Sequence, residues 1–267
     1  MIDWVAQQLE KNISQWDNSI ERYYPKYLEY WRNPKKHLDL LENITNNLDA
    51  VKLINWDKYI CNENTKVLDF GGGTGWLSAY LSLNKYISSI IMLDSSKLLI
   101  ETMVPGIINL MNGNEKKIKC VRGLFSPLLF DDNSFDVVVA SAALHHSDCM
   151  EDVLLEINRV LKKKGLLIII NETPYSNIKY VWAVIKQFIK ILIKTSTKKY
   201  ISKSPSISSS GYLYDPFLGD KTYPEWYWIK AIEKSGFICI EKQNTALKPL
   251  KVNDDGENIT HFICSKV

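Results

Sequence analysis

Short apolar runs alternate with longer amphipathic stretches along most of the chain from residue 66 onward. The runs have the length of strands, and the stretches between them repeat apolar residues at helical spacing. This alternation predicts an α/β fold with a doubly wound, mostly parallel sheet. Strands are expected at 66–70, 89–93, 117–121, 135–140 and 166–171, with helices from about 75, at 96–111 and at 150–161. Two further strands, at 237–242 and 259–264, are expected to form an antiparallel edge hairpin, which makes the sheet seven-stranded.

The first 62 residues differ, because their apolar side chains recur at helical spacing. This pattern includes Trp4, Leu9, Ile13, Trp16 and Ile20. It predicts a helical N-terminal layer at 1–62 ahead of the main domain at 63–267. The layer either packs on the core of that domain or covers the substrate, for which its many aromatic side chains suit it.

A long insertion is predicted between the fifth strand and the C-terminal strands, at about 176–222. It begins with an expected helix at 177–194, in which Lys186, Lys190 and Lys194 share one stripe. We interpret this helix as a packing helix with one wet edge, although a basic amphipathic helix can also lie on a membrane surface. A loop at 195–221 follows, and its tyrosines, including Tyr212 and Tyr214, indicate a partly ordered lid after strand five.

Composition and charge exclude several classes of protein. The chain is 46% hydrophobic and 24% charged, and its net charge of +3 is too small to indicate nucleic-acid binding. No signal peptide is evident, and Lys186, Gln187 and Lys190 interrupt the longest apolar stretch, so a membrane span is not expected. The five cysteines lack paired spacing, which argues for a reducing, cytoplasmic compartment and against a bound metal.

A glycine-dense turn follows the first predicted strand. It reads Asp69-Phe70-Gly71-Gly72-Gly73-Thr74-Gly75. A strand, a tight loop and a helix start bring backbone N–H groups against a ligand. The dinucleotide fingerprint needs glycine at its first, third and sixth places. Counted from Gly71, the sixth place is Trp76, so the loop does not match that fingerprint.

The loop resembles the first motif of class I S-adenosylmethionine (SAM)-dependent methyltransferases, and the resemblance extends over about residues 64–172. It implies a Rossmann-like fold, SAM as the methyl donor and S-adenosylhomocysteine as the product. The residues that it places on the donor are Asp69, Phe70, Gly71, Gly72, Gly73, Gly75, Asp94, Ser95, Gly123, Leu124, Phe125 and Ser141.

Two of these positions also have an interpretation from the residues themselves. Asp94 lies 25 residues after Asp69, near the spacing at which an acid reaches ribose hydroxyls in nucleotide folds, but it could instead cap the next helix. Many family members carry an acid for the adenine amino group where this chain has Gly123-Leu124. We therefore expect apolar stacking by Leu124 or Phe125 there.

Candidate catalytic residues follow the fourth and fifth strands. His145 and His146 come just past strand four, where an imidazole could act as a general base on an acceptor hydroxyl. His146 is the first choice, and the alternative is that both histidines cap a helix or line the SAM pocket. Glu172 is a further acid–base candidate. Tyr175, Tyr212 and Tyr214 are the predicted substrate contacts.

These features predict a methyltransferase that acts on a small molecule, most simply by O-methylation of a metabolite or of a sugar-containing intermediate. The chain lacks an Asn/Asp-Pro-Pro-aromatic motif after strand four and a Pro-Cys nucleophile, so nucleic acid is not the expected acceptor. N- and C-methylation stay open. The alternatives are a non-catalytic SAM-binding regulator and a methyltransferase for a lipid-linked acceptor with peripheral membrane contact.

Overall fold

The structure is a computed structural model that describes residues 1–4, 28–194, 206–207, 213–214, 220–249 and 257–267; for 190–194, 206–207 and 213–214 only the backbone is described. Its centre is a sheet with the strand order β1-β4-β3-β2-β5-β6-β11-β10. The strands are β1 (Ile2–Asp3), β2 (Thr65–Phe70), β3 (Ile87–Asp94), β4 (Ile118–Arg122), β5 (Phe135–Ser141), β6 (Leu161–Glu172), β10 (Phe237–Asn244) and β11 (Thr260–Lys266).

The sheet confirms the predicted Rossmann-like fold. Strands β1 to β6 pair in parallel, whereas β11 runs antiparallel to both β6 and β10 and completes the C-terminal hairpin. The sheet has one strand more than the seven predicted. The additional strand is β1, which pairs in parallel with the outer edge of β4. The buried Trp4 follows it, and the ring centroids of Trp4 and Phe130 are 4.5 Å apart.

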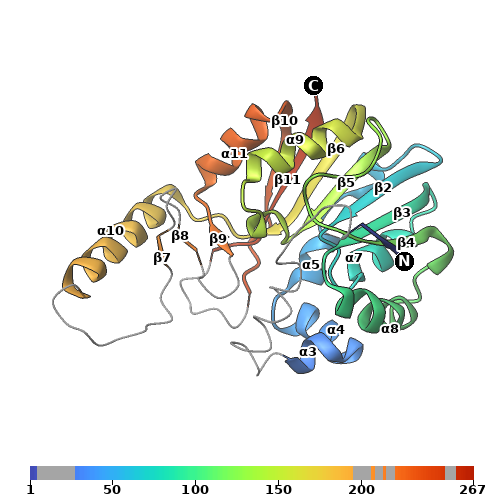
Figure 1. The fold of residues 1–267 in the computed structure, drawn as a ribbon, viewed down its shortest axis with the longest axis horizontal. Helices are drawn as coiled ribbons and strands as arrows, with labels where there is room; N and C mark the ends of the chain where they lie inside the picture. Colours follow the sequence, from blue (N-terminus) through green and yellow to red (C-terminus); the bar gives the residue numbers. More distant parts are fainter. Residues whose placement is uncertain (5–27, 195–205, 208–212, 215–219, 250–256) are drawn as a thin grey trace.

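Helices cover both faces of the sheet (Figure 1). They are α7 (Trp76–Ser82), α8 (Val104–Leu110), α9 (Met150–Val160) and α11 (Glu225–Lys234), with a π-helical turn η2 (Leu99–Met103) before α8. Alternate residues of each central strand pack into different clusters: Val138 faces the α9 and α11 side, and Val137 faces the α7 and α8 side. Burial on both faces explains why these strands are continuous apolar runs in the sequence.

The described part of the N-terminal segment contains short helices: α3 (Leu28–Arg32), α4 (Pro34–Asn43), α5 (Asn47–Lys52) and α6 (Trp56–Tyr59). Asn33 caps α4, because its side-chain oxygen accepts a hydrogen bond from the backbone N–H of Lys36, and Pro34 occupies the first helical position. Leu41 and Val51 pack against the α7 side of the sheet. Of the predicted helical pattern, the stretch at 5–27 lies outside the described residues.

The insertion between β6 and α11 contains α10 (Asn177–Lys194) and a small antiparallel sheet formed by β7 (Ser206–Ile207), β8 (Leu213–Tyr214) and β9 (Lys221–Thr222). Its two ends are joined, because the N–H of Tyr175 donates to Tyr223 O and the N–H of Glu225 donates to Tyr175 O. Figure 1 shows α10 projecting away from the body of the protein. Within the described residues, no helix is both long enough and apolar enough to cross a membrane.

Candidate active site

A cavity of about 580 Å³ lies at the carboxyl ends of the parallel strands, where open α/β sheets bind ligands. One wall is the loop after β2, and the opposite wall is the segment after β5. Trp31, His37, Leu41 and Asn47 of the N-terminal helices contribute further lining, and so does Lys221 of the insertion. Asp94, Asp148 and Asp152 give the wall an acidic character that suits a cationic ligand.

The glycine loop has a shape that larger residues could not adopt. Gly71, Gly73 and Gly75 have φ values of 70°, 54° and 80°, in the left-handed region that favours glycine. A Cβ atom at Gly72 would lie 2.3 Å from Met92 Cγ, whereas a Cβ atom at Gly73 would meet no atom within 4 Å. The loop therefore packs tightly against β3 on one side and leaves open space at Gly73, where a ligand can approach the backbone.

Asp94 ends β3 and holds this loop in place. One carboxylate oxygen accepts a hydrogen bond from the N–H of Gly73 (2.8 Å), and the other accepts one from the N–H of Ser96 (2.8 Å). Asp94 is not itself the cap of the following helix: the Ser96 hydroxyl accepts the hydrogen bond from the N–H of Leu99 (3.0 Å), and Asp94 fixes the N–H of Ser96. Because each carboxylate oxygen can accept more than one hydrogen bond and Asp94 lines the cavity next to Ser95, the same group can still receive ribose hydroxyls.

The predicted adenine side is apolar. Leu124 and Phe125 line the cavity, and the ring of Phe125 lies 4.4 Å from that of the buried Phe70, which supports it from behind. Gly123 is not a lining residue; its N–H donates to Asp94 O (3.0 Å) and ties the ends of β3 and β4 together. Ser141, at the end of β5, lines the cavity.

Asp69 lies behind the loop and outside the cavity lining. Its carboxylate is buried and accepts a hydrogen bond from the Ser78 hydroxyl (2.6 Å). Burial raises the pKa of Asp69 to about 7, despite the opposing hydrogen bond from Ser78. Asp69 therefore supports the loop from behind, rather than contacting a ligand in the cavity.

Asp69→Asn is expected to stabilise the protein at pH 8 and to change its stability little at pH 4. Because the folded pKa is about 7, well above the unfolded value near 3.8, the folded state binds more protons between these pH values and loses stability as the pH rises through this window. The loss is on the order of 4 kcal/mol, and the uncharged amide avoids it. Thermal unfolding of both proteins across this range tests the assignment; equal destabilisation at both pH values would refute it.

A strained turn positions the two histidines after β5. Ala142 has a φ of 47°, uncommon for a residue with a Cβ atom, and its N–H donates to Ile170 O (2.9 Å). The chain then forms a single 3₁₀ turn, η4 (Leu144–His146), with Leu144 buried in the core. This anchor presents the side chains of His145 and His146 beside each other, with ring centroids 4.2 Å apart.

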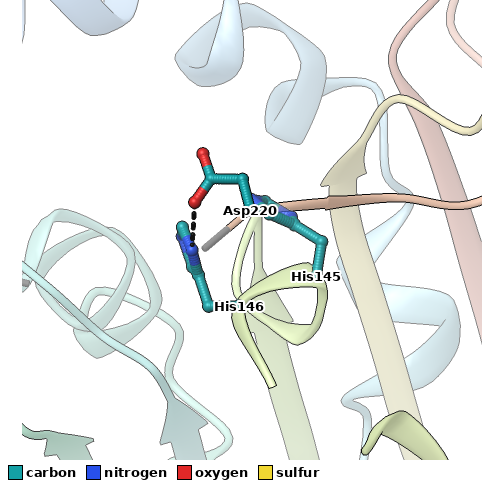
Figure 2. A group of neighbouring side chains, drawn as sticks. All are labelled: His145, His146 and Asp220. Atoms are coloured by element: carbon teal, nitrogen blue, oxygen red, sulfur yellow. Dashed lines mark ion pairs between the residues drawn. The ribbon is translucent and has the colours of Figure 1, made fainter. Parts of the chain in front are cut away.

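Each histidine has a carboxylate partner. His145 Nδ1 lies 2.7 Å from Glu172 Oε2, and Glu172 is only 2% exposed. His146 Nδ1 lies 2.7 Å from Asp220 Oδ1, as Figure 2 shows. His146 lines the cavity, but neither His145 nor Glu172 does. The geometry thus gives His146 direct access to a ligand and leaves His145 and Glu172 to support it.

The carboxylates set the ionisation of this group. Burial opposes a charge on His145, but the negative charge of Glu172 and its contact with the ring outweigh burial and raise the pKa of His145. Burial likewise favours the neutral form of Asp220, yet its contact with His146 and the nearby charges of His145 and Lys221 lower the pKa of Asp220. Asp220 is therefore an ionised partner for the imidazole of His146 at neutral pH.

The same residues have the chemistry of metal ligands. His145, His146 and Asp220 each offer one ligand atom, and these atoms lie within 4.8 Å of one another. Two ligands of one ion, bound at about 2.1 Å and at a right angle, would be roughly 3 Å apart. The 2.7 Å between His146 Nδ1 and Asp220 Oδ1 is slightly shorter than this, and within the described residues neither atom has a hydrogen-bond partner.

Glu172→Gln is expected to destabilise the protein more at pH 6 than at pH 9. A raised histidine pKa contributes stability that is fully present below the unfolded pKa and is lost as the pH rises through the folded pKa. Glutamine removes the charge that raises the pKa of His145. The difference in the free energy of unfolding between the variant and the unmodified protein should therefore shrink with rising pH. Urea unfolding at several pH values measures it, and a pH-independent difference would contradict this role for Glu172.

Several residues of the site are not evident from the sequence. Lys221 is the first residue of β9, at the far end of the insertion, and Asp220 directly precedes it. His37 is buried at the cavity wall, and burial lowers its pKa to about 4, so it is neutral. Tyr175 is not a lining residue, Tyr212 lies outside the described residues, and only the backbone of Tyr214 is described.

The fold is that of the class I, Rossmann-like methyltransferases. Residues 68–169 match the methyltransferase domain family, whose structural neighbours include SAM-dependent enzymes. This match covers less than half of the chain and indicates a methyltransferase domain, of a family whose methyl donor is SAM.

Relatives of known sequence support this class. The chain is 29% identical to the uncharacterized methyltransferase YcgJ of Bacillus subtilis, in a match that covers 42% of each protein. It is 28% identical to the ubiquinone biosynthesis O-methyltransferase of Pelagibacter ubique, over 62% of this chain and 68% of that protein. It also resembles a SAM-dependent methyltransferase structure from Methanosarcina mazei, with a TM-score of 0.58, 20% identity and coverage of 80% of this chain and 98% of the other. The match thus spans less than half the length of YcgJ.

Proposed function

We propose that this protein transfers the methyl group of SAM to a hydroxyl oxygen of a small molecule that binds in the cavity beside His146. The position of His146 supports this proposal most directly, because His146 lines the same cavity as the glycine loop and Asp220 Oδ1 lies 2.7 Å from its Nδ1. A cavity of about 580 Å³ is within the range of small-molecule sites.

His146 has the arrangement of a general base. The negative charge of Asp220, whose Oδ1 lies 2.7 Å from Nδ1 without the alignment of a hydrogen bond, favours the tautomer with the proton on Nδ1. That tautomer leaves the lone pair on Nε2. SAM supplies a sulfonium-activated methyl group, and its transfer to an oxygen leaves S-adenosylhomocysteine. Nε2 of His146 would take the proton that the acceptor hydroxyl loses, and Asp220 would stabilise the resulting imidazolium.

The comparisons leave the acceptor atom open, because the relatives are named for different reactions. One is an O-methyltransferase of ubiquinone biosynthesis, another a glycine and sarcosine N-methyltransferase, and a third a sterol C-methyltransferase. A base supports oxygen as the acceptor, since a hydroxyl must lose its proton during transfer. Lys221 also lines the cavity wall, where its Nζ lies 3.7 Å from Asp148 Oδ1.

Incubation with labelled SAM and a panel of hydroxyl-bearing metabolites and nucleotide sugars tests the proposal. Mass spectrometry should find a methylated product and an equal amount of S-adenosylhomocysteine, with the same rate after chelation of divalent metals. Loss of activity with a chelator would favour a cation at His145, His146 and Asp220 over a general base. SAM binding with no transfer to any acceptor would favour a regulatory protein.

A further inference from the structure

Helix α10 presents an apolar face to solvent. Six large apolar side chains on it are 41–74% exposed: Ile178, Val181, Trp182, Ile185, Phe188 and Ile189. Among the side chains described for α10, at 177–189, the opposite edge packs, with Tyr180 buried and Ala183, Val184 and Gln187 partly buried. The helix predicted to pack with one solvent-exposed edge therefore exposes an apolar face to water, which is unfavourable for a folded chain.

The exposed residues form one continuous stripe. At 100° per residue, Ile178, Trp182, Ile185 and Ile189 fall within about 60° of one another, and Val181 and Phe188 extend the stripe on one side. Lys179 and Lys186 lie along its other border, both exposed. Lys179 also contacts Glu257 at 3.4 Å. The helix thus has separate packing, basic and apolar faces.

Charge in this part of the chain is one-sided. No Asp or Glu occurs between Glu172 and Asp215, whereas the same stretch contains Lys179, Lys186, Lys190, Lys194, Lys198, Lys199 and Lys203. The whole chain carries a net charge of only +3, so the remainder is slightly acidic. Positive charge is therefore concentrated in the part of the sequence that contains the apolar stripe.

We propose that α10 lies on an anionic lipid surface, with its apolar stripe among the acyl chains and its lysines at the level of the headgroups. A helix with an apolar face, a lysine border and a tryptophan in the apolar face has the composition of interfacial membrane helices. Anionic lipid is the occupant that satisfies both the apolar stripe and the excess of lysine, since a second copy of α10 would place like charges together. This inference does not depend on the identity of the methyl acceptor.

Sedimentation of the full chain with vesicles tests the proposal. We expect binding to vesicles of phosphatidylcholine mixed with phosphatidylglycerol, and binding weaker by about tenfold or more to phosphatidylcholine alone. Trp182→Glu should weaken binding to the mixed vesicles by about tenfold or more, and Lys186→Glu should weaken it in a salt-dependent manner. Both side chains are exposed, and circular dichroism checks that each variant is folded.

Ile238→Glu is the matched control, because Ile238 is also more than half exposed but lies on β10. It should bind the mixed vesicles as the unmodified protein does. The proposal is overturned if the protein does not bind the mixed vesicles, if Ile238→Glu weakens binding as much as Trp182→Glu, or if sedimentation velocity shows a dimer that Trp182→Glu abolishes in place of vesicle binding.

Discussion

Replacing His146 with alanine is expected to lower kcat by about 10²–10⁴-fold and to leave the affinity for SAM within about threefold. His146 lies on the cavity wall with Asp220 at its Nδ1, so the variant loses the group that accepts the proton of the acceptor hydroxyl. It does not remove any part of the glycine loop. Steady-state formation of S-adenosylhomocysteine measures kcat, and calorimetric titration measures the affinity for SAM.

Two further variants distinguish a base from a residue that only shapes the pocket. Asp220→Asn keeps the size of the side chain but removes the charge beside Nδ1, so it should lower kcat, but less than His146→Ala does. Added imidazole should partly restore the activity of His146→Ala. Full turnover by His146→Ala with an identified acceptor would show that the reaction needs no base at this position.

The second large effect is expected at Asp94. Asp94→Ala should weaken SAM binding by about 10- to 100-fold, because it removes a charged acceptor for ribose hydroxyls as well as the hydrogen bonds that Gly73 and Ser96 donate. Asp94→Asn keeps one acceptor oxygen and should lose less. Calorimetry with SAM and with S-adenosylhomocysteine gives both affinities.

Asp131→Ala is a suitable control for the loss of one negative charge, because Asp131 is exposed in the turn before β5 and does not line the cavity. It should bind SAM as the unmodified protein does. If Asp94→Ala bound SAM with unchanged affinity, the ribose assignment would be wrong and Asp94 would serve only to hold the N–H groups of Gly73 and Ser96.

The order of elements was predictable because burial on both faces makes each central strand a continuous apolar run. Strand β1 was not predictable, because a two-residue strand is too short to show a period and its pairing with β4 depends on tertiary contacts. The same limit applies to α10. Its sequence shows two kinds of face, but only the structure shows that the apolar stripe points away from the sheet.

The donor side of the site was predictable to the extent that it depends on local backbone shape. The glycine loop can be recognised from its glycines, because Gly71 and Gly73 have φ values that other residues rarely adopt. No comparable local feature of the sequence marks Asp220. It reaches His146 from the end of an insertion of about fifty residues, and no spacing rule connects the two. His37 is similar, because a single histidine in an amphipathic helix is indistinguishable from a core residue.

A crystal structure of the protein with S-adenosylhomocysteine would show where the donor lies relative to His146. We predict that the product occupies the cavity with its amino-acid part against Gly73, its ribose hydroxyls on Asp94 and its adenine beside Leu124 and Phe125. Its sulfur should face the space in front of His146, where the acceptor would bind. A product bound outside this cavity, or with its sulfur directed away from His146, would contradict the account.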